Sequence, residues 1–153
     1  TSTFGGNALA CAAAIETINI IFDEKLTENA VEVGDYLIAE LKNIAKTSKV
    51  IESVRGVGLM IGVEMIKPHS GFVKRRSEGY SATLASLIAG DLLNNQRIIT
   101  AFTLNNPHTI RLEPPLLITK SDADILLSAL EQSCNKNKSY ARAIFSTAKN
   151  LIT

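Results

Sequence analysis

Apolar residues recur along the chain at two different spacings, one typical of helices and one of strands. The helical spacing of three and four residues occurs in residues 8–22, 27–47, 80–95, a stretch that follows Thr119, and 140–151. Shorter runs rich in β-branched and aliphatic residues, typical of strands, occur at residues 50–54, 59–66, 98–103 and 108–112. The pattern therefore predicts helix, helix, strand, strand, helix, strand, strand, helix, followed by a helical tail.

This order predicts an α+β fold in which helices cover one side of a small, three- or four-stranded, largely antiparallel sheet. Asn7, Thr27 and Thr119 precede helical stretches and are predicted N-caps, because their side chains can accept a backbone N–H of the first turn. Residues 55–58 form so short a connection that the strands beside it should pair as a hairpin. Gly34 lies inside a helical stretch, which indicates a close packing contact there.

The predicted buried faces follow from the same spacing. Three predicted helices each have one apolar face. The residues of these faces are Ala30, Val33, Leu37, Leu41, Ile44 and Ala45 in the helix at 27–47, Leu84, Leu87, Ile88 and Leu92 in the helix at 80–95, and Ile125, Leu126, Ala129, Leu130 and Cys134 in the helix after Thr119. Cys11 and Cys134 are far apart and form no CxxC pair, so both are expected to be small buried residues of a protein kept in a reducing compartment.

Length and composition narrow the class of protein. The chain has 153 residues and a net charge of +1, with 46% hydrophobic and 20% charged residues, which fits one globular domain and excludes intrinsic disorder. The charge balance and the absence of Trp argue against a nucleic-acid binder. No apolar run approaches the roughly 20 residues that span a bilayer, so a cytoplasmic protein is expected.

The chain opens with a Gly-rich turn and no initiator Met, so we expect it to be the C-terminal piece of a longer protein. The hydroxyl groups of Ser2 and Thr3 precede a helix N-terminus, whose unpaired N–H groups attract anions. From the residues alone, this segment is either an anion-binding turn or a plain capped turn.

Several catalytic motifs are excluded. The glycines of residues 55–62 stand at the wrong spacing for a dinucleotide fingerprint and precede a strand instead of a helix. His69 and His108 are too few and too far apart for a metal site, and no nucleophile-elbow motif occurs. The basic loop at residues 67–79 is predicted to be a solvated surface loop.

Arg111 is the strongest single candidate for binding chemistry. Alternation in its strand places Ile110 and Leu112 on one side and Arg111 on the other. A guanidinium on a strand that ends at Pro114 suits a carboxylate clamp, because it offers a planar fork. The alternative is an ordinary surface arginine; Glu113 is expected to point to the opposite face and not to pair with it.

Four ordered blocks resemble the class III aminotransferases, enzymes of fold type I that use pyridoxal 5′-phosphate (PLP). These blocks are residues 2–14 (STFGGNALACAAA), 54–64 (VRGVGLMIGVE), 103–106 (TLNN) and 110–119 (IRLEPPLLIT). The last two blocks are most similar to the putrescine-specific branch of the family. The resemblance covers nearly everything up to about Glu131.

The resemblance implies specific roles. Thr3, helped by Ser2, would bind the PLP phosphate of the neighbouring subunit, and Arg111 would bind a substrate carboxylate, such as that of 2-oxoglutarate. The lysine that carries the cofactor and the Asp that pairs with the pyridine nitrogen would lie upstream of this chain. No lysine here stands in a matching motif, so no catalytic residue is assigned.

The expected organisation is residues 1–24 as the end of a large PLP-binding domain, 25–135 as the C-terminal small domain, and 136–153 as a tail. The resemblance further implies that the whole protein is a homodimeric ω-aminotransferase with shared active sites, which acts on a diamine or ω-amino acid such as putrescine or ornithine. No metal, nucleic acid or membrane is expected as a partner. The alternative is a stand-alone, non-catalytic module used for dimerisation or regulation.

Overall fold

The computed structural model of the protein describes residues 3, 5–66, 77–102 and 105–138. Its elements, in chain order, are α1 (Ala8–Asp23), α2 (Leu26–Thr47), β1 (Ile51–Val57), β2 (Met60–Met65), α3 (Ser77–Gln96), β3 (Ala101–Phe102), β4 (Thr109–Leu112) and α4 (Lys120–Lys136). The order of helices and strands predicted from the sequence is confirmed for these residues. The predicted helix at residues 140–151 and most of the loop at residues 67–79 lie outside the described part of the chain.

The strands form one four-stranded antiparallel sheet in the order β1-β2-β4-β3. The predicted hairpin of β1 and β2 is confirmed, but the first strand continues through Val57, so the turn is confined to Gly58 and Leu59. Gly58 has a φ of +54°, a backbone conformation that favours glycine. Buried residues alternate along β2 with exposed or half-buried ones, which fits a sheet that is covered on one side.

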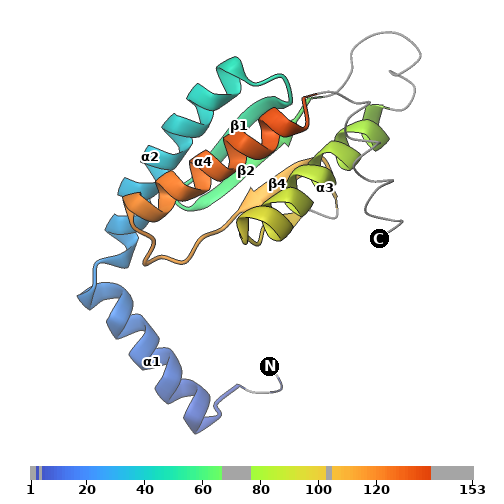
Figure 1. Ribbon diagram of the computed structural model, residues 1–153. Coiled ribbons are helices and arrows are strands. Elements are labelled where there is room, and N and C mark those ends of the chain that lie inside the picture. The colour runs from blue at the N-terminus through green and yellow to red at the C-terminus, as the bar shows by residue number, and fades with distance from the viewer. Residues whose placement is uncertain (1–2, 4, 67–76, 103–104, 139–153) are drawn as a thin grey trace.

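Helices α2, α4 and α3 lie side by side over one face of the sheet (Figure 1). The core between them is aliphatic, and its fully buried members include Leu37 and Leu41 from α2, Val63 from β2, Ile110 from β4 and Leu130 from α4. The predicted α+β architecture, with helices on one side of a small antiparallel sheet, is therefore confirmed.

Two of the three predicted N-caps are confirmed. The side chain of Asn7 accepts a hydrogen bond from the Ala10 N–H at 3.0 Å, and Thr119 forms a capping box with Asp122. The prediction for Thr27 is wrong, because α2 already begins at Leu26, whose side chain is buried. Lys25, with a φ of +51°, turns the chain at that point.

Two residues that the sequence predicts to be buried are exposed in the structure. Ile125 is 62% exposed, because α4 inserts between α2 and α3 through a face that includes Leu126, Leu130 and Cys134 and leaves Ile125 outside it. Cys11 is also exposed, in contrast to Cys134, which is buried as predicted. Burial raises the pKa of Cys134 to about 12, so this thiol stays protonated and is a poor nucleophile.

Helix α1 differs from the other helices because none of its residues is buried. It contacts α2 near its C-terminal end and extends away from the sheet (Figure 1). Leu9 and Phe22 are 81% and 73% exposed, and Ile15, Ile18 and Ile20 are exposed as well. An apolar surface of this kind is typical of an interface with other protein. Among the described residues, no helix has the length and hydropathy to cross a membrane.

Candidate functional site

Arg111 lies on the face of the sheet that the helices do not cover. Its neighbours Ile110 and Leu112 are buried beneath the helices, and the alternation along β4 turns Arg111 to the other side, as the sequence predicts. Hydrogen-bonded partners flank β4 on both sides, with Gly62 of β2 and Ala101 of β3 opposite Arg111. The guanidinium is therefore carried by an inner strand of the sheet, and its side chain is 40% exposed.

Glu113 is the ion-pair partner of Arg111. Nε of Arg111 donates a hydrogen bond of 3.0 Å to Oε1 of Glu113, and Nη2 donates to the same oxygen. The prediction that Glu113 points to the opposite face is wrong, because residues two apart in an extended chain lie on the same face. Glu113 precedes Pro114, which disfavours a helical backbone at Glu113 and keeps it extended beyond the end of the strand.

A second ionic cluster occupies the same face of the sheet. Glu64 of β2 accepts hydrogen bonds from Arg55 at 2.8 Å and from Ser53 at 3.2 Å, and its other oxygen lies 3.0 Å from Nε2 of His108. Sequence analysis missed this cluster because it placed Arg55 in a turn. The signal was the alternation along β2, in which Glu64 stands between the buried Val63 and Met65 and therefore faces the other side of the sheet.

Cross-strand pairing brings the two clusters together. Arg55 of β1 pairs with Gly62 of β2, and Gly62 pairs with Arg111 of β4. Residues that are directly opposite one another share a face of the sheet, so Arg55 and Arg111 lie on the same face, on either side of Gly62, which has no side chain. This open face is thus a charged surface of arginine and glutamate side chains.

The other predicted binding residues lie at the start of α1. Thr3 is exposed in the turn before this helix, and Ser2 lies outside the described residues. Gly6 has a φ of +78°. The side chain of Asn7 accepts a hydrogen bond from the N–H of Ala10, and its backbone carbonyl accepts one from the N–H of Cys11. The N-terminus of a 16-residue helix thus follows Thr3 in the chain, and a helix N-terminus favours an anion such as a phosphate group.

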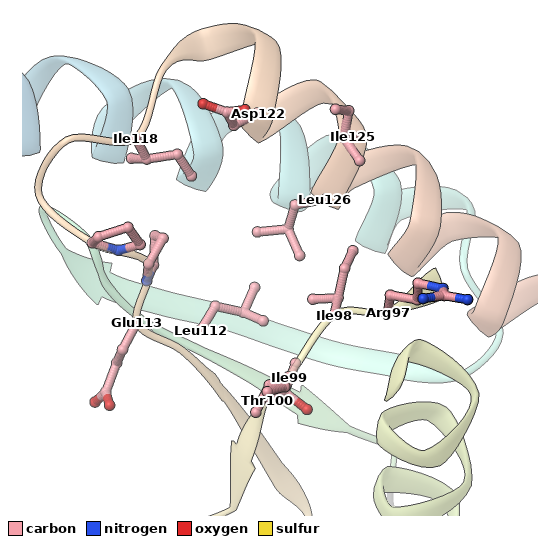
Figure 2. A pocket seen from close by; sticks show the side chains of 12 residues that line it. Arg97, Ile98, Ile99, Thr100, Leu112, Glu113, Ile118, Asp122, Ile125 and Leu126 are labelled. Atoms are coloured by element: carbon pink, nitrogen blue, oxygen red, sulfur yellow. The ribbon is translucent and has the colours of Figure 1, made fainter. Parts of the chain in front are cut away.

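The structure also contains an apolar cavity of about 380 Å³ between β4 and the start of α4. Leu112, Ile118 and Leu126 line it, and the side chain of Glu113 turns away from it (Figure 2). Arg111 is absent from its lining. Glu113 is among the lining residues, so the cavity adjoins the charged face of the sheet at the partner of Arg111.

Two further chemistries are not supported by the described residues. They contain no group of three or more His, Cys, Asp or Glu side chains that could hold a metal ion. The Gly-rich segment at residues 55–62 forms a strand, a turn and a second strand, so no helix N-terminus follows it, as the sequence predicts.

The chain is similar to one known protein family and to solved structures of aminotransferases. The family described as aminotransferase class-III matches residues 1–134. Ornithine δ-aminotransferase of Plasmodium falciparum is 29% identical, with a TM-score of 0.70, over 90% of this chain and 31% of its own. Acetylornithine aminotransferase of Elizabethkingia anophelis is 29% identical, with a TM-score of 0.67, over 88% of this chain and 31% of its own.

A third similar structure is an amine transaminase from an uncultivated Pseudomonas species, determined in a PLP-bound form. It is 30% identical, with a TM-score of 0.72, over 88% of this chain and 29% of its own. The 153 residues thus span about a third of the length of these proteins.

Proposed function

Because the chain belongs to the class-III aminotransferases, we propose that it forms the C-terminal part of a PLP-dependent ω-aminotransferase. In this proposal, residues 1–24 are the end of a large PLP-binding domain, 25–135 the small domain and 136–153 a tail. The uncovered apolar surface of α1 supports the first boundary, because a large domain would bury it. The expected cytoplasmic location stays a prediction.

The observation that carries the proposal is the position of Arg111 on the open face of the sheet. A guanidinium held by an inner strand is a fixed fork for a carboxylate. We infer that Arg111 binds a carboxylate of 2-oxoglutarate, the amino-group acceptor. The donor is proposed to be a diamine or an ω-amino acid of the putrescine or ornithine type, which fits the similarity to ornithine and acetylornithine aminotransferases.

The residues at the start of α1 fit a phosphate group, since the exposed Thr3 hydroxyl and the helix N-terminus offer hydrogen-bond donors. We propose that Thr3, with Ser2, holds the PLP phosphate of the neighbouring subunit in a homodimer. PLP would supply the electron sink that amino-group transfer requires. The lysine that carries PLP is proposed to lie outside these 153 residues, so the chain alone is expected to be inactive.

The test is the substitution Arg111→Ala in the full-length protein, with KM measured separately for 2-oxoglutarate and for putrescine. Loss of a charged carboxylate partner should raise KM for 2-oxoglutarate about tenfold or more. KM for putrescine should change little, because a diamine has no carboxylate. Equal changes in the two KM values, or none in either, would overturn the role of Arg111.

A further inference from the structure

We propose that Asn29 is a positioning residue for the carboxylate site, because its side chain holds the loop that follows Arg111 against the start of α2. This loop, residues 113–119, joins β4 to α4. The inference rests on the proposed role of Arg111 as the carboxylate-binding residue. It adds a residue of another element, on the first turn of a helix, to the parts of the chain on which that role depends.

The hydrogen-bonded ladder of the sheet ends where this loop begins. Arg111 pairs with both neighbouring strands, with Gly62 of β2 and Ala101 of β3 opposite it. Leu112 pairs only with Ile61 of β2, and in the described part of the chain no strand pairs with the residues that follow. The course of the backbone beyond Arg111 therefore depends on contacts made by the loop itself.

Asn29 gives both donors of its side-chain amide to this loop. Nδ2 of Asn29 donates to the backbone carbonyl of Leu116 at 2.7 Å and to that of Ile118 at 3.1 Å. A side-chain amide has two N–H groups, so its donating capacity is used completely here. Pro114 and Pro115 have no backbone N–H, which leaves the loop with more carbonyl groups than backbone donors. The amide of Asn29 makes up for this shortage.

Both ends of the contact are fixed by other hydrogen bonds. The backbone N–H of Asn29 donates to the carbonyl of Lys25 at 3.1 Å, in the first turn of α2. At the far end of the loop, Thr119 forms the capping box with Asp122 that begins α4. All of these partners lie within residues 25–122, so the contact needs nothing from the proposed large domain.

A fixed loop gives the backbone after Arg111 a single course. An arginine that meets a carboxylate through two parallel hydrogen bonds tolerates little change in its orientation. Without the amide of Asn29 the loop is free to relax, and the guanidinium of Arg111 loses part of its fixed direction. The affinity for the carboxylate acceptor should then fall, whereas a diamine donor has no carboxylate and is unaffected.

The experiment compares the full-length enzyme with its Asn29→Ala variant. Three quantities are measured: KM for 2-oxoglutarate, KM for putrescine, and the inhibition constant of glutarate, a dicarboxylate with no keto group to accept an amino group. KM for 2-oxoglutarate and the inhibition constant should rise about threefold to tenfold, while KM for putrescine stays the same. A KM does not depend on the amount of folded enzyme, so a loss of stability alone does not produce this difference.

A second variant and a control sharpen the result. Asn29→Asp keeps the shape of the side chain but has no N–H to donate, so it should raise KM for 2-oxoglutarate at least as much as Asn29→Ala. Asp91→Asn is the matched control, because it breaks a link between α3 and α4 through Ser133 and Lys136. These partners lie at the other end of α4, about 20 Å from the loop, so the control should leave both KM values unchanged. An equal rise in the control would indicate a general effect of lower stability and overturn the positioning role.

The Arg111→Ala background separates the two proposals. There, Asn29→Ala should raise KM for 2-oxoglutarate no further, because no guanidinium is left to position. The same rise in both backgrounds would show that Asn29 acts independently of Arg111, and the positioning role would be wrong. If Arg111→Ala raises KM for 2-oxoglutarate but Asn29→Ala changes both KM values equally or neither, the positioning role is again wrong and the role of Arg111 stands. If Arg111→Ala itself has no effect, the proposed function fails and this inference fails with it.

Discussion

Gly34 of α2 packs directly against Gly58 in the turn between β1 and β2. A Cβ atom at Gly34 would lie 2.3 Å from the carbonyl carbon and the carbonyl oxygen of Gly58. These are backbone atoms of a turn with a positive φ, which cannot move aside as a flexible side chain can. Glycine at position 34 therefore allows the helix to lie close to the hairpin.

We predict that Gly34→Ala destabilises the protein by about 1–3 kcal/mol, because the helix must move away from Gly58. Urea unfolding measures this change. Gly90→Ala is the matched control, since Gly90 also lies in a helix but a Cβ there meets no atom within 4 Å. The control should stabilise the protein by about 0.5–1 kcal/mol; equal changes in both variants would show that the contact with Gly58 is unimportant.

Asn29 is predicted to stabilise the loop after β4. Its side-chain amide donates to two backbone carbonyls, those of Leu116 and Ile118, far away in sequence. Asn29→Ala would leave both carbonyls without this donor, and we expect a loss of about 1–3 kcal/mol in the free energy of unfolding.

Asn43→Ala provides the comparison for this measurement. Asn43 lies on the same helix, is exposed, and bonds only to side chains one turn away, Glu40 and Lys46. Its substitution should change the free energy of unfolding by less than about 0.5 kcal/mol. A loss at Asn43 as large as that at Asn29 would contradict the special role of Asn29.

Asp91 links α3 to α4 and should make stability depend on pH. Burial alone would raise the pKa of Asp91, but hydrogen bonds from Lys136, Ser133 and Asn95 outweigh it and hold the pKa below its usual value. Because the folded pKa is lowered, the contribution is present above the unfolded value, about 3.9, and is lost as pH falls through the folded value.

The measurement for Asp91 is the melting temperature of the wild type and of Asp91→Asn between pH 7 and pH 2. We expect the variant to melt at a lower temperature at pH 7, with a difference that shrinks below about pH 4 as the carboxylate of the wild type is protonated. A difference that is constant across this range would show that the charge of Asp91 has no part in the link.

Thr3 offers a test of the proposed cofactor contact. In the full-length homodimer, Thr3→Val should raise the PLP dissociation constant about tenfold or more, because a hydrogen bond to a charged phosphate is lost. Fluorescence titration of PLP into the apoenzyme measures it. Thr47→Val, an exposed threonine at the end of α2, is the control and should leave the constant unchanged. Unchanged binding in Thr3→Val would exclude Thr3 from the phosphate site.

Alternation along a strand was enough to predict the side of the sheet to which Arg111 points, because Ile110 and Leu112 must be buried. The partner of Arg111 was predicted wrongly, since the same alternation continues past the strand through Glu113, where Pro114 holds the chain extended. Thr27 has the chemistry of an N-cap, but with Leu26 buried the helix starts two residues earlier than that cap would place it. Local propensity thus yields to packing at the ends of elements.

Packing between helices could not be read from spacing alone. Ile125 fits the apolar period of its helix, yet α4 inserts between α2 and α3 through other residues and leaves Ile125 beside the cavity. Cys11 has apolar neighbours in sequence, but no residue of α1 is buried in the described structure. Burial at such positions depends on what the helix packs against, and sequence spacing does not specify that.

The intact mass of the protein purified from its native host tests most directly whether this chain is part of a larger aminotransferase. The chain covers 31% of the ornithine δ-aminotransferase it resembles, so we predict a mass about three times 16.5 kDa, with PLP bound. A mass of 16.5 kDa would contradict the enzyme proposal and leave a stand-alone, non-catalytic small domain, whose exposed helix α1 would need another protein to cover it.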